Sequence, residues 1–378
     1  MIRITGIQYN DLREEYLKRL SSIGAVEFDS RDILNDDKIP SEGRTQKTYD
    51  ELSGTEYLIN IRDKLYYNRE RIKRNYLREI LAGPEEMPRS LGGDGVENLL
   101  SLFNRIKEDL GECDNRDDRG KLECIFKYKE FLKKGKREQL SYWLIQTLNL
   151  KTCPYCNVGY TMAYVGENQS FRTPLDHFFS KSRYPYLSVS LFNLVPACNT
   201  CNSIKHDSKK SIVYPFEESF DEGDNHCSFR VIPNHGHPEI WFGNSDEFRI
   251  EFHPRNDKIR KKENLFQLSL NQRFEEFIGE EYWKRIKNSV QLLCLEDIYS
   301  DCYRDEIQKL IRNYYEYNKH GIEMIMHDKK EAADNWLLRD MLYFASLKES
   351  EWGNSSFNKM KKDILEQLDQ IAVETFKE

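Results

Sequence analysis

Apolar residues recur with a helical period through the first part of the chain. One predicted helix begins at an Asn-Asp pair and ends at Gly24, and another ends at Gly83. A turn-rich break, 84–95, follows the second of these. The pattern therefore predicts an N-terminal helical region, residues 1–149. Its predicted helices span 10–24, 55–83, 96–111 and 121–150.

From Cys153 onward the pattern changes to short apolar or alternating runs of strand length, separated by turns. The candidate strands are 159–166, 187–195, 227–233 and 247–254. From about Lys262 the helical period returns and continues to the end of the chain. The expected fold class is α+β. It consists of a small core at 150–215, a short β-rich extension at 216–261 and a C-terminal helical region at 262–378.

Composition excludes several classes of protein. The chain has 378 residues, of which 39% are hydrophobic and 12% aromatic, too many for a disordered chain. No run of about 18 apolar residues predicts a membrane span, and the N-terminus lacks the apolar core of a signal peptide. We therefore expect a cytoplasmic protein with no membrane partner. The net charge is −7, but residues 150–215 carry seven Lys and Arg against three Asp and Glu.

Four of the nine cysteines form two CxxC pairs, Cys153 with Cys156 and Cys198 with Cys201. The other five lack ligand spacing and are expected to be reduced thiols. The alternative is a redox CxxC, which normally occurs as one pair beside a thioredoxin-like pattern. Two pairs in a chain with no secretion signal favour zinc bound by four thiolates. Because four cysteines leave no open coordination position, this Zn²⁺ is expected to be structural.

The segment between and after the cysteine pairs resembles a nuclease motif. Residues 175–207 read LDHFFSKSRYPYLSVSLFNLVPACNTCNSIKHD. They contain, in order, an Asp-His on a first strand, an Asn at the exit of a second, a CxxC and an Asn-x-x-Lys that opens a helix. This order is similar to that of HNH endonucleases, the ββα-metal superfamily, in their zinc-knuckle form. The resemblance covers about 150–215 and implies a ββα core that hydrolyses phosphodiester bonds with one catalytic metal ion.

The resemblance implies a role for each residue of the motif. His177 would be the general base that takes a proton from the attacking water, and Asn193 would orient it by a hydrogen bond. Asp176 and Asn202 are the implied ligands of a catalytic Mg²⁺ or Mn²⁺, since both offer hard oxygen donors. Lys205 lies three residues past Asn202, one helical turn on, and is the implied phosphate contact.

His206 departs from the family pattern, because many members carry Gly-Asp or Gly-Asn after the helix lysine. It is therefore a candidate third metal ligand or an extra phosphate contact. Each residue of the motif also has a purely structural interpretation: a solvated or satisfied histidine, an asparagine that caps a helix, or one that ends a strand. On that interpretation the chain is a zinc-stabilised module that binds nucleic acid or protein without cutting it.

A second resemblance narrows the biological setting. Together with CPYC at 153–156 and YPFEESF at 214–220, the motif is similar to the nuclease subunit of Septu-like anti-phage defence systems. That family works beside an ABC-type ATPase, so DNA as substrate and such a protein partner are implied. HNH chemistry also permits an RNA substrate. A basic cluster outside the core, 66–76, mixes Tyr with Arg and either follows a nucleic-acid backbone or forms a solvated helix face.

Overall fold

The computed structural model describes most of the chain up to residue 219 and, beyond it, two short segments and one single residue. The described residues are 3–4, 6–88, 91, 97–132, 140–166, 169–206, 213–219, 227–233, 248–254 and 363. Two compact units are formed, one by 1–222 with 353–356 and the other by 223–352 with 357–378. The helices predicted within 262–378 lie outside the described residues, except for Asp363. The domain boundaries expected after 149, 215 and 261 stay predictions.

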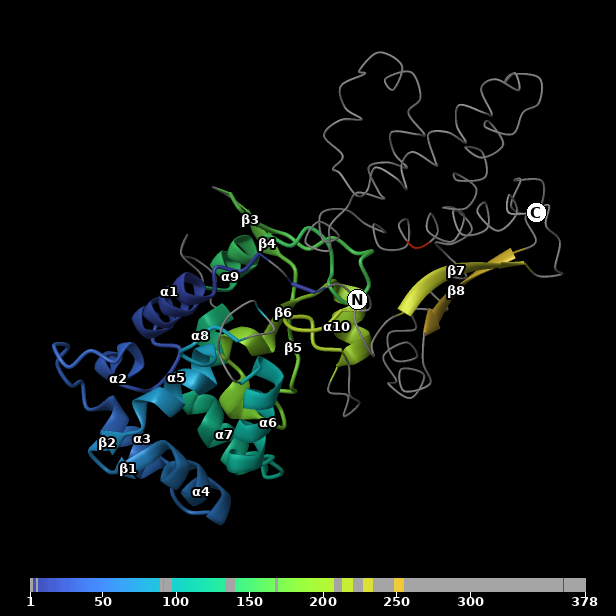
Figure 1. Cartoon of the computed structure of the whole chain (residues 1–378). Coiled ribbons are helices and arrows are strands. Elements are labelled where there is room, and N and C mark those ends of the chain that lie inside the picture. The colour runs from blue at the N-terminus through green and yellow to red at the C-terminus, as the bar shows by residue number, and fades with distance from the viewer. Residues whose placement is uncertain are drawn as a thin grey trace, which may run out of the picture. The chain divides into compact units, whose positions relative to one another are not determined.

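Helices dominate the first unit as far as Leu148 (Figure 1). In α1, Leu12, Tyr16 and Leu20 recur every four residues and are all buried, so they form one apolar stripe. The predicted helices at 10–24 and 96–111 are confirmed by α1 and α6. The helices of this region are α1 (Tyr9–Ser22), α2 (Ser30–Leu34), α3 (Arg44–Glu51), α4 (Glu56–Leu65), α5 (Arg74–Ala82), α6 (Leu99–Leu110), α7 (Arg116–Ile125), α8 (Tyr128–Leu132) and α9 (Leu140–Leu148).

The continuous helix predicted at 55–83 is wrong. It is interrupted between α4 and α5 by a small antiparallel hairpin of β1 (Tyr66–Asn68) and β2 (Arg71–Ile72). The Asn68 side chain accepts a hydrogen bond from the Glu70 amide at 2.9 Å, a local turn contact that competes with helix formation. Tyr66 and Ile72 pair across the hairpin and are both buried. Burial of this pair therefore outweighs the helical period of the segment.

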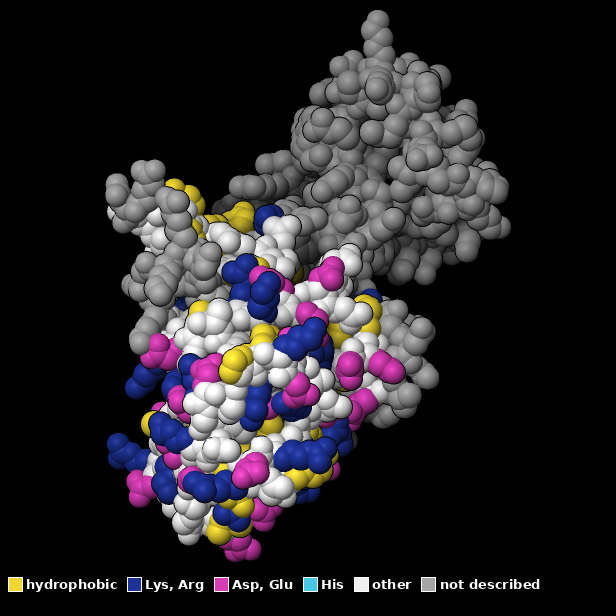
Figure 2. All heavy atoms as spheres, turned by 90° about the vertical axis from the view of Figure 1, so that its left-hand side faces the viewer, with side chains coloured by type: hydrophobic (Ala, Val, Ile, Leu, Met, Phe, Trp, Pro, Cys, Tyr) yellow, Lys and Arg dark blue, Asp and Glu magenta, His cyan; other side chains and the backbone are white. Residues whose placement is uncertain are grey.

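The hairpin also changes the interpretation of the basic cluster at 66–76. Tyr67 is 66% exposed, and the Arg71 guanidinium lies 5.1 Å from its ring centroid. Arg69 is paired with Asp50 through two hydrogen bonds of 2.9 and 2.7 Å. On the face shown in Figure 2, Lys and Arg side chains are interspersed with Asp and Glu. The charges on this face therefore do not form one large basic patch.

Among the described residues, the strands are short and pair two by two in antiparallel sheets. In the first unit β3 (Ala163–Val165) pairs with β4 (Ser170–Arg172), and β5 (Leu175–His177) pairs with β6 (Leu194–Pro196). The second unit contains β7 (Cys227–Pro233) paired with β8 (Phe248–Pro254), which confirms the two strands predicted there. A mixed α+β fold with small hairpins is thus confirmed.

The strand predicted at 187–195 is mostly wrong. Two 3₁₀ turns, Pro185–Leu187 and Leu191–Asn193, occupy this stretch, and only its last two residues belong to β6. Every residue from 185 to 198 is buried, so the apolar run indicates burial and not strand geometry. The alternation of apolar and polar residues from Leu187 to Leu191 is misleading here, because both serines are buried along with the apolar side chains.

The β5–β6 hairpin and the following helix α10 (Asn199–Lys205) pack within the same unit as the N-terminal helices (Figure 1). The Tyr16 hydroxyl donates to the Val189 carbonyl at 2.6 Å, and the Tyr9 and Phe192 rings stack at 5.4 Å. The helices therefore support the loop that joins β5 to β6. No helix in the described part of the chain is long and apolar enough to cross a membrane.

Candidate metal centre and histidine site

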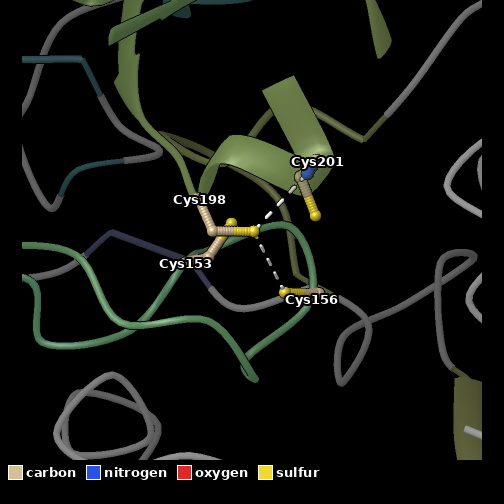
Figure 3. A group of neighbouring side chains, drawn as sticks. All are labelled: Cys153, Cys156, Cys198 and Cys201. Atoms are coloured by element: carbon tan, nitrogen blue, oxygen red, sulfur yellow. Dashed lines mark hydrogen bonds between the residues drawn. The ribbon is translucent and has the colours of Figure 1, made fainter. Parts of the chain in front are cut away.

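The two CxxC pairs meet in one buried cluster (Figure 3). The sulfur atoms of Cys153, Cys156, Cys198 and Cys201 all lie within 4.8 Å of one another. The Cys156 and Cys198 sulfurs are 3.9 Å apart. Four Zn–S bonds of about 2.3 Å in a tetrahedron place the sulfurs about 3.8 Å apart. The cluster therefore fits a structural metal such as Zn²⁺, as the cysteine spacing predicts.

Backbone amides shape both turns around this cluster. The Val158 amide donates to the Cys156 sulfur, and the Cys201 amide donates to the Cys198 sulfur, each at 3.4 Å. The Asn157 amide closes the first turn on the Cys153 carbonyl at 2.7 Å. Asn157 adopts a φ of 53°, the left-handed region that asparagine tolerates better than most residues. Amide donors directed at sulfur stabilise the thiolate form that a metal requires.

Proton sharing among the four thiols separates their acidities. Hydrogen bonding with the Cys153 thiol lowers the pKa of Cys156 and brings that of Cys198 to about 7. Burial raises the pKa of Cys153. Both shifts favour the thiolate form that a metal ion requires.

Gly159 allows the two halves of the cluster to approach. A Cβ at this position would lie 2.5 Å from the Cys198 Cβ and 3.0 Å from its sulfur. We expect Gly159→Ala to lower zinc content and destabilise the fold by about 1–3 kcal/mol, as overpacking of a core does. Zinc per chain and thermal melting measure this. Gly120→Ala, whose Cβ would meet nothing within 4 Å, is the matched control, and equal zinc content in both variants would contradict the prediction.

His177 lies at the end of β5, paired with Leu194 of β6. Its Nε2 is 2.9 Å from the Ser188 carbonyl oxygen. Since a carbonyl only accepts, Nε2 carries the proton in this bond, and Nδ1 is the basic nitrogen of the neutral ring. The Tyr128 ring meets the imidazole edge-on at 4.5 Å. The backbone thus selects the tautomer whose Nδ1 is able to accept a proton.

Asp176, the preceding residue on β5, is 4% exposed and contacts both the first cysteine turn and helix α10. Its Oδ2 accepts a hydrogen bond of 2.6 Å from the Tyr155 hydroxyl, and Tyr155 belongs to the first cysteine turn. The Lys205 ammonium, from α10, lies 2.9 Å from the same oxygen and donates to the His177 carbonyl at 2.7 Å. Lys205 is itself only 5% exposed. Asp176 and Lys205 therefore form a buried, hydrogen-bonded ion pair.

Asn193 is fully buried and holds the loop between β5 and β6 closed. Its Oδ1 accepts from the Phe179 amide at 2.7 Å, and its Nδ2 donates to the Phe179 and Leu187 carbonyls at 3.1 and 2.9 Å. These bonds fix the loop that presents the Ser188 carbonyl to His177. Through these bonds Asn193 acts on His177 indirectly, by holding the loop in place.

The remaining candidates lie on or just after α10. Asn202 is half-buried. Its backbone amide donates to the Cys198 carbonyl at 3.0 Å, which joins the first turn of the helix to a cysteine of the cluster. His206 is exposed and ends the helix with a φ of 39°. The metal-binding roles of both residues, and the phosphate-binding role of Lys205, stay predictions.

Two tyrosines in this site were missed by sequence reasoning. Tyr155 stands between two cysteine ligands, where it reads as part of the turn, and Tyr128 lies in a helical segment about fifty residues before His177. Only the position of Tyr155 inside the CxxC could have drawn attention to it. Comparisons with protein-family models, with curated proteins and with solved structures find no match to this chain.

Proposed function

We propose that this chain is a metal-dependent endonuclease of the HNH type that hydrolyses DNA phosphodiester bonds. The observation that carries the proposal is the state of His177, whose Nε2 is 2.9 Å from the Ser188 carbonyl oxygen. A general base needs an unprotonated nitrogen at working pH, and in a neutral ring whose Nε2 proton points at this carbonyl that nitrogen is Nδ1. The buried cysteine cluster next to β5, β6 and α10 provides the rigid support that such a base requires.

In this proposal the residues of the site divide the chemistry among them. His177 takes a proton from the attacking water at Nδ1. Asp176 and Asn202 hold Mg²⁺ or Mn²⁺, with His206 as a candidate third ligand. The divalent ion, when bound, neutralises charge on the phosphate and on the leaving 3′ oxygen. Asn193 keeps the loop closed, so that the Ser188 carbonyl stays against Nε2.

The donor set suits a hard cation, because carboxylate and amide oxygens are its usual ligands. The Asp176 carboxylate already faces one positive group, the Lys205 ammonium at 2.9 Å. A divalent ion would share this carboxylate with Lys205, which keeps a second acceptor in the His177 carbonyl at 2.7 Å. The same ion pair favours the second candidate function, a non-cleaving module, since Lys205 can neutralise Asp176 without a metal ion.

Cleavage of supercoiled plasmid DNA tests the proposal. Protein that retains its zinc is incubated with added Mg²⁺ or Mn²⁺, and separately with no added divalent ion. We expect nicked and linear products only when the divalent ion is added. Plasmid that is bound but uncut under both metals would support the non-cleaving module instead. A matched RNA incubated in parallel identifies an RNA-directed nuclease if it alone is cut.

The proposal includes a protein partner. The net charge of −7 opposes tight binding of a polyanion, and the excess of positive charge at 150–215 is modest. A partner that delivers the substrate resolves this difficulty, and an ABC-type ATPase is the partner that the Septu-like resemblance implies. If the chain alone binds duplex DNA tightly at physiological salt, this argument for a partner protein no longer holds.

A further inference from the structure

A pocket of about 400 Å³ lies beside the histidine site. Its walls come from the end of α7, the start of α8 and the loop between β5 and β6. A volume of this size falls within the range of small-molecule sites. The lining residues used below are Phe126, Lys127, Tyr128, Lys129, Lys181 and Ser188.

Two of these lining residues contact His177 directly. The Ser188 carbonyl lies 2.9 Å from the His177 Nε2, and the Tyr128 ring lies 4.5 Å from the imidazole. The Ser188 hydroxyl also donates to the Phe126 carbonyl at 3.2 Å, which ties the loop to the segment between α7 and α8. Tyr128 and Ser188 therefore stand between the pocket and the imidazole, and each contacts both.

The pocket lining combines three lysines and an aromatic ring with two glutamates, Glu123 and Glu130, so its excess of positive charge is small. Lys129 and Lys181 are exposed, and the Lys181 ammonium lies 4.9 Å from the Tyr128 ring centroid. Lys127 forms an ion pair with Glu27, so its charge is partly neutralised and it attracts a phosphate less than the other two lysines do. Burial raises the pKa of Tyr128 to about 12, so its ring is neutral at physiological pH. Lysines suit phosphate and a neutral aromatic face suits a base, so together they fit a nucleotide.

We propose that this pocket binds a nucleotide of the substrate strand that adjoins the scissile phosphodiester, with Lys129 and Lys181 on its phosphate and Tyr128 against its base. The inference rests on the proposed function, since it places the reacting phosphate at His177. It assigns part of substrate binding to α7 and α8, outside the residues that resemble the HNH motif.

The first test measures binding in a His177→Ala background, so that it does not depend on cleavage. Fluorescence anisotropy with a labelled 20-base-pair duplex compares this protein with the same protein carrying Lys129→Ala and Lys181→Ala. We expect at least about tenfold weaker binding. The slope of log affinity against log salt concentration should also become shallower, by the equivalent of about two phosphate contacts. The control carries Lys38→Ala and Lys47→Ala, two exposed lysines outside the pocket, for the same change in net charge. Binding by the pocket variant equal to that of the control would overturn the inference.

A second measurement uses Cys124, an exposed thiol that lines the pocket. Duplex DNA should slow its alkylation by iodoacetamide, followed by mass spectrometry of the peptide that contains it. Inorganic polyphosphate is the comparison, since it offers phosphates without bases. Protection by DNA and not by polyphosphate supports a nucleotide site, whereas equal protection by both, or by neither, refutes it.

The two proposals fail in different ways. If wild-type protein cuts the plasmid while the Lys129 and Lys181 variant binds DNA like its control, the nuclease stands and the pocket assignment is wrong. If no plasmid is cut under either metal but the pocket variant loses DNA binding and Cys124 is protected, the nuclease proposal fails. The pocket then remains a nucleotide site of a binding module.

Discussion

His177→Ala is expected to lower the rate of plasmid cleavage by about 10²–10⁴-fold, the usual contribution of a general base. The side chain is half-buried at the end of β5, and its Nε2 bond to the Ser188 carbonyl leaves Nδ1 as the basic nitrogen. Alanine removes that nitrogen without disturbing the cysteine cluster. Initial rates with supercoiled plasmid and Mg²⁺ measure the loss.

Two controls separate lost chemistry from lost structure in this variant. The variant should retain wild-type zinc content and a melting temperature close to that of the wild type. Added imidazole should restore part of the activity to His177→Ala, because it supplies the missing base in solution. A variant that folds, binds zinc and cuts as fast as wild type would remove His177 from the mechanism.

Cys201→Ser is expected to have the largest effect on stability. Cys201 is fully buried, and its sulfur is one of four within 4.8 Å. Changes outside the ligand shell already weaken metal binding by 10–100-fold, so loss of a ligand should cost more than about 100-fold in zinc affinity. Since metal binding contributes directly to folding, the melting temperature should fall as well. Zinc content after dialysis and thermal melting give the two readouts.

Cys124→Ser is the matched control for Cys201→Ser, because Cys124 is exposed and lies outside the cluster. It should retain one zinc ion per chain and the wild-type melting temperature. If Cys201→Ser also retained both, the four cysteines would not form a metal site, and a reduced thiol cluster would be the remaining interpretation.

The metal cluster could be predicted from the spacing of its cysteines. Two CxxC pairs are the usual spacing of a four-cysteine zinc site, and the structure brings all four sulfurs together. The helix predicted at 55–83 failed because burial of the paired Tyr66 and Ile72 across a hairpin, helped by the turn contact at Asn68, outweighs the periodicity of the segment. The strand at 187–195 failed because burial, and not strand pairing, accounts for its apolar run.

Lys205 shows a different limit of sequence reasoning. Its position after Asn202 predicts a basic group on α10, and α10 is present. Its burial beside Asp176 depends on how α10 packs against β5, which no local pattern contains. The contacts of Tyr128 with His177 depend in the same way on the packing of α8.

The hydroxyl of Tyr155 has a consequence for how the protein responds to its surroundings. Tyr155 lies between two cysteines of the cluster, yet its hydroxyl donates a hydrogen bond to Asp176, twenty-one residues along the chain. If the cluster holds zinc, oxidation of Cys153 or Cys156 or removal of the ion would release the turn that carries Tyr155, and Asp176 would lose a hydrogen-bond donor. The supply of zinc and the redox state of two thiols would then govern a carboxylate that never touches the metal cluster itself.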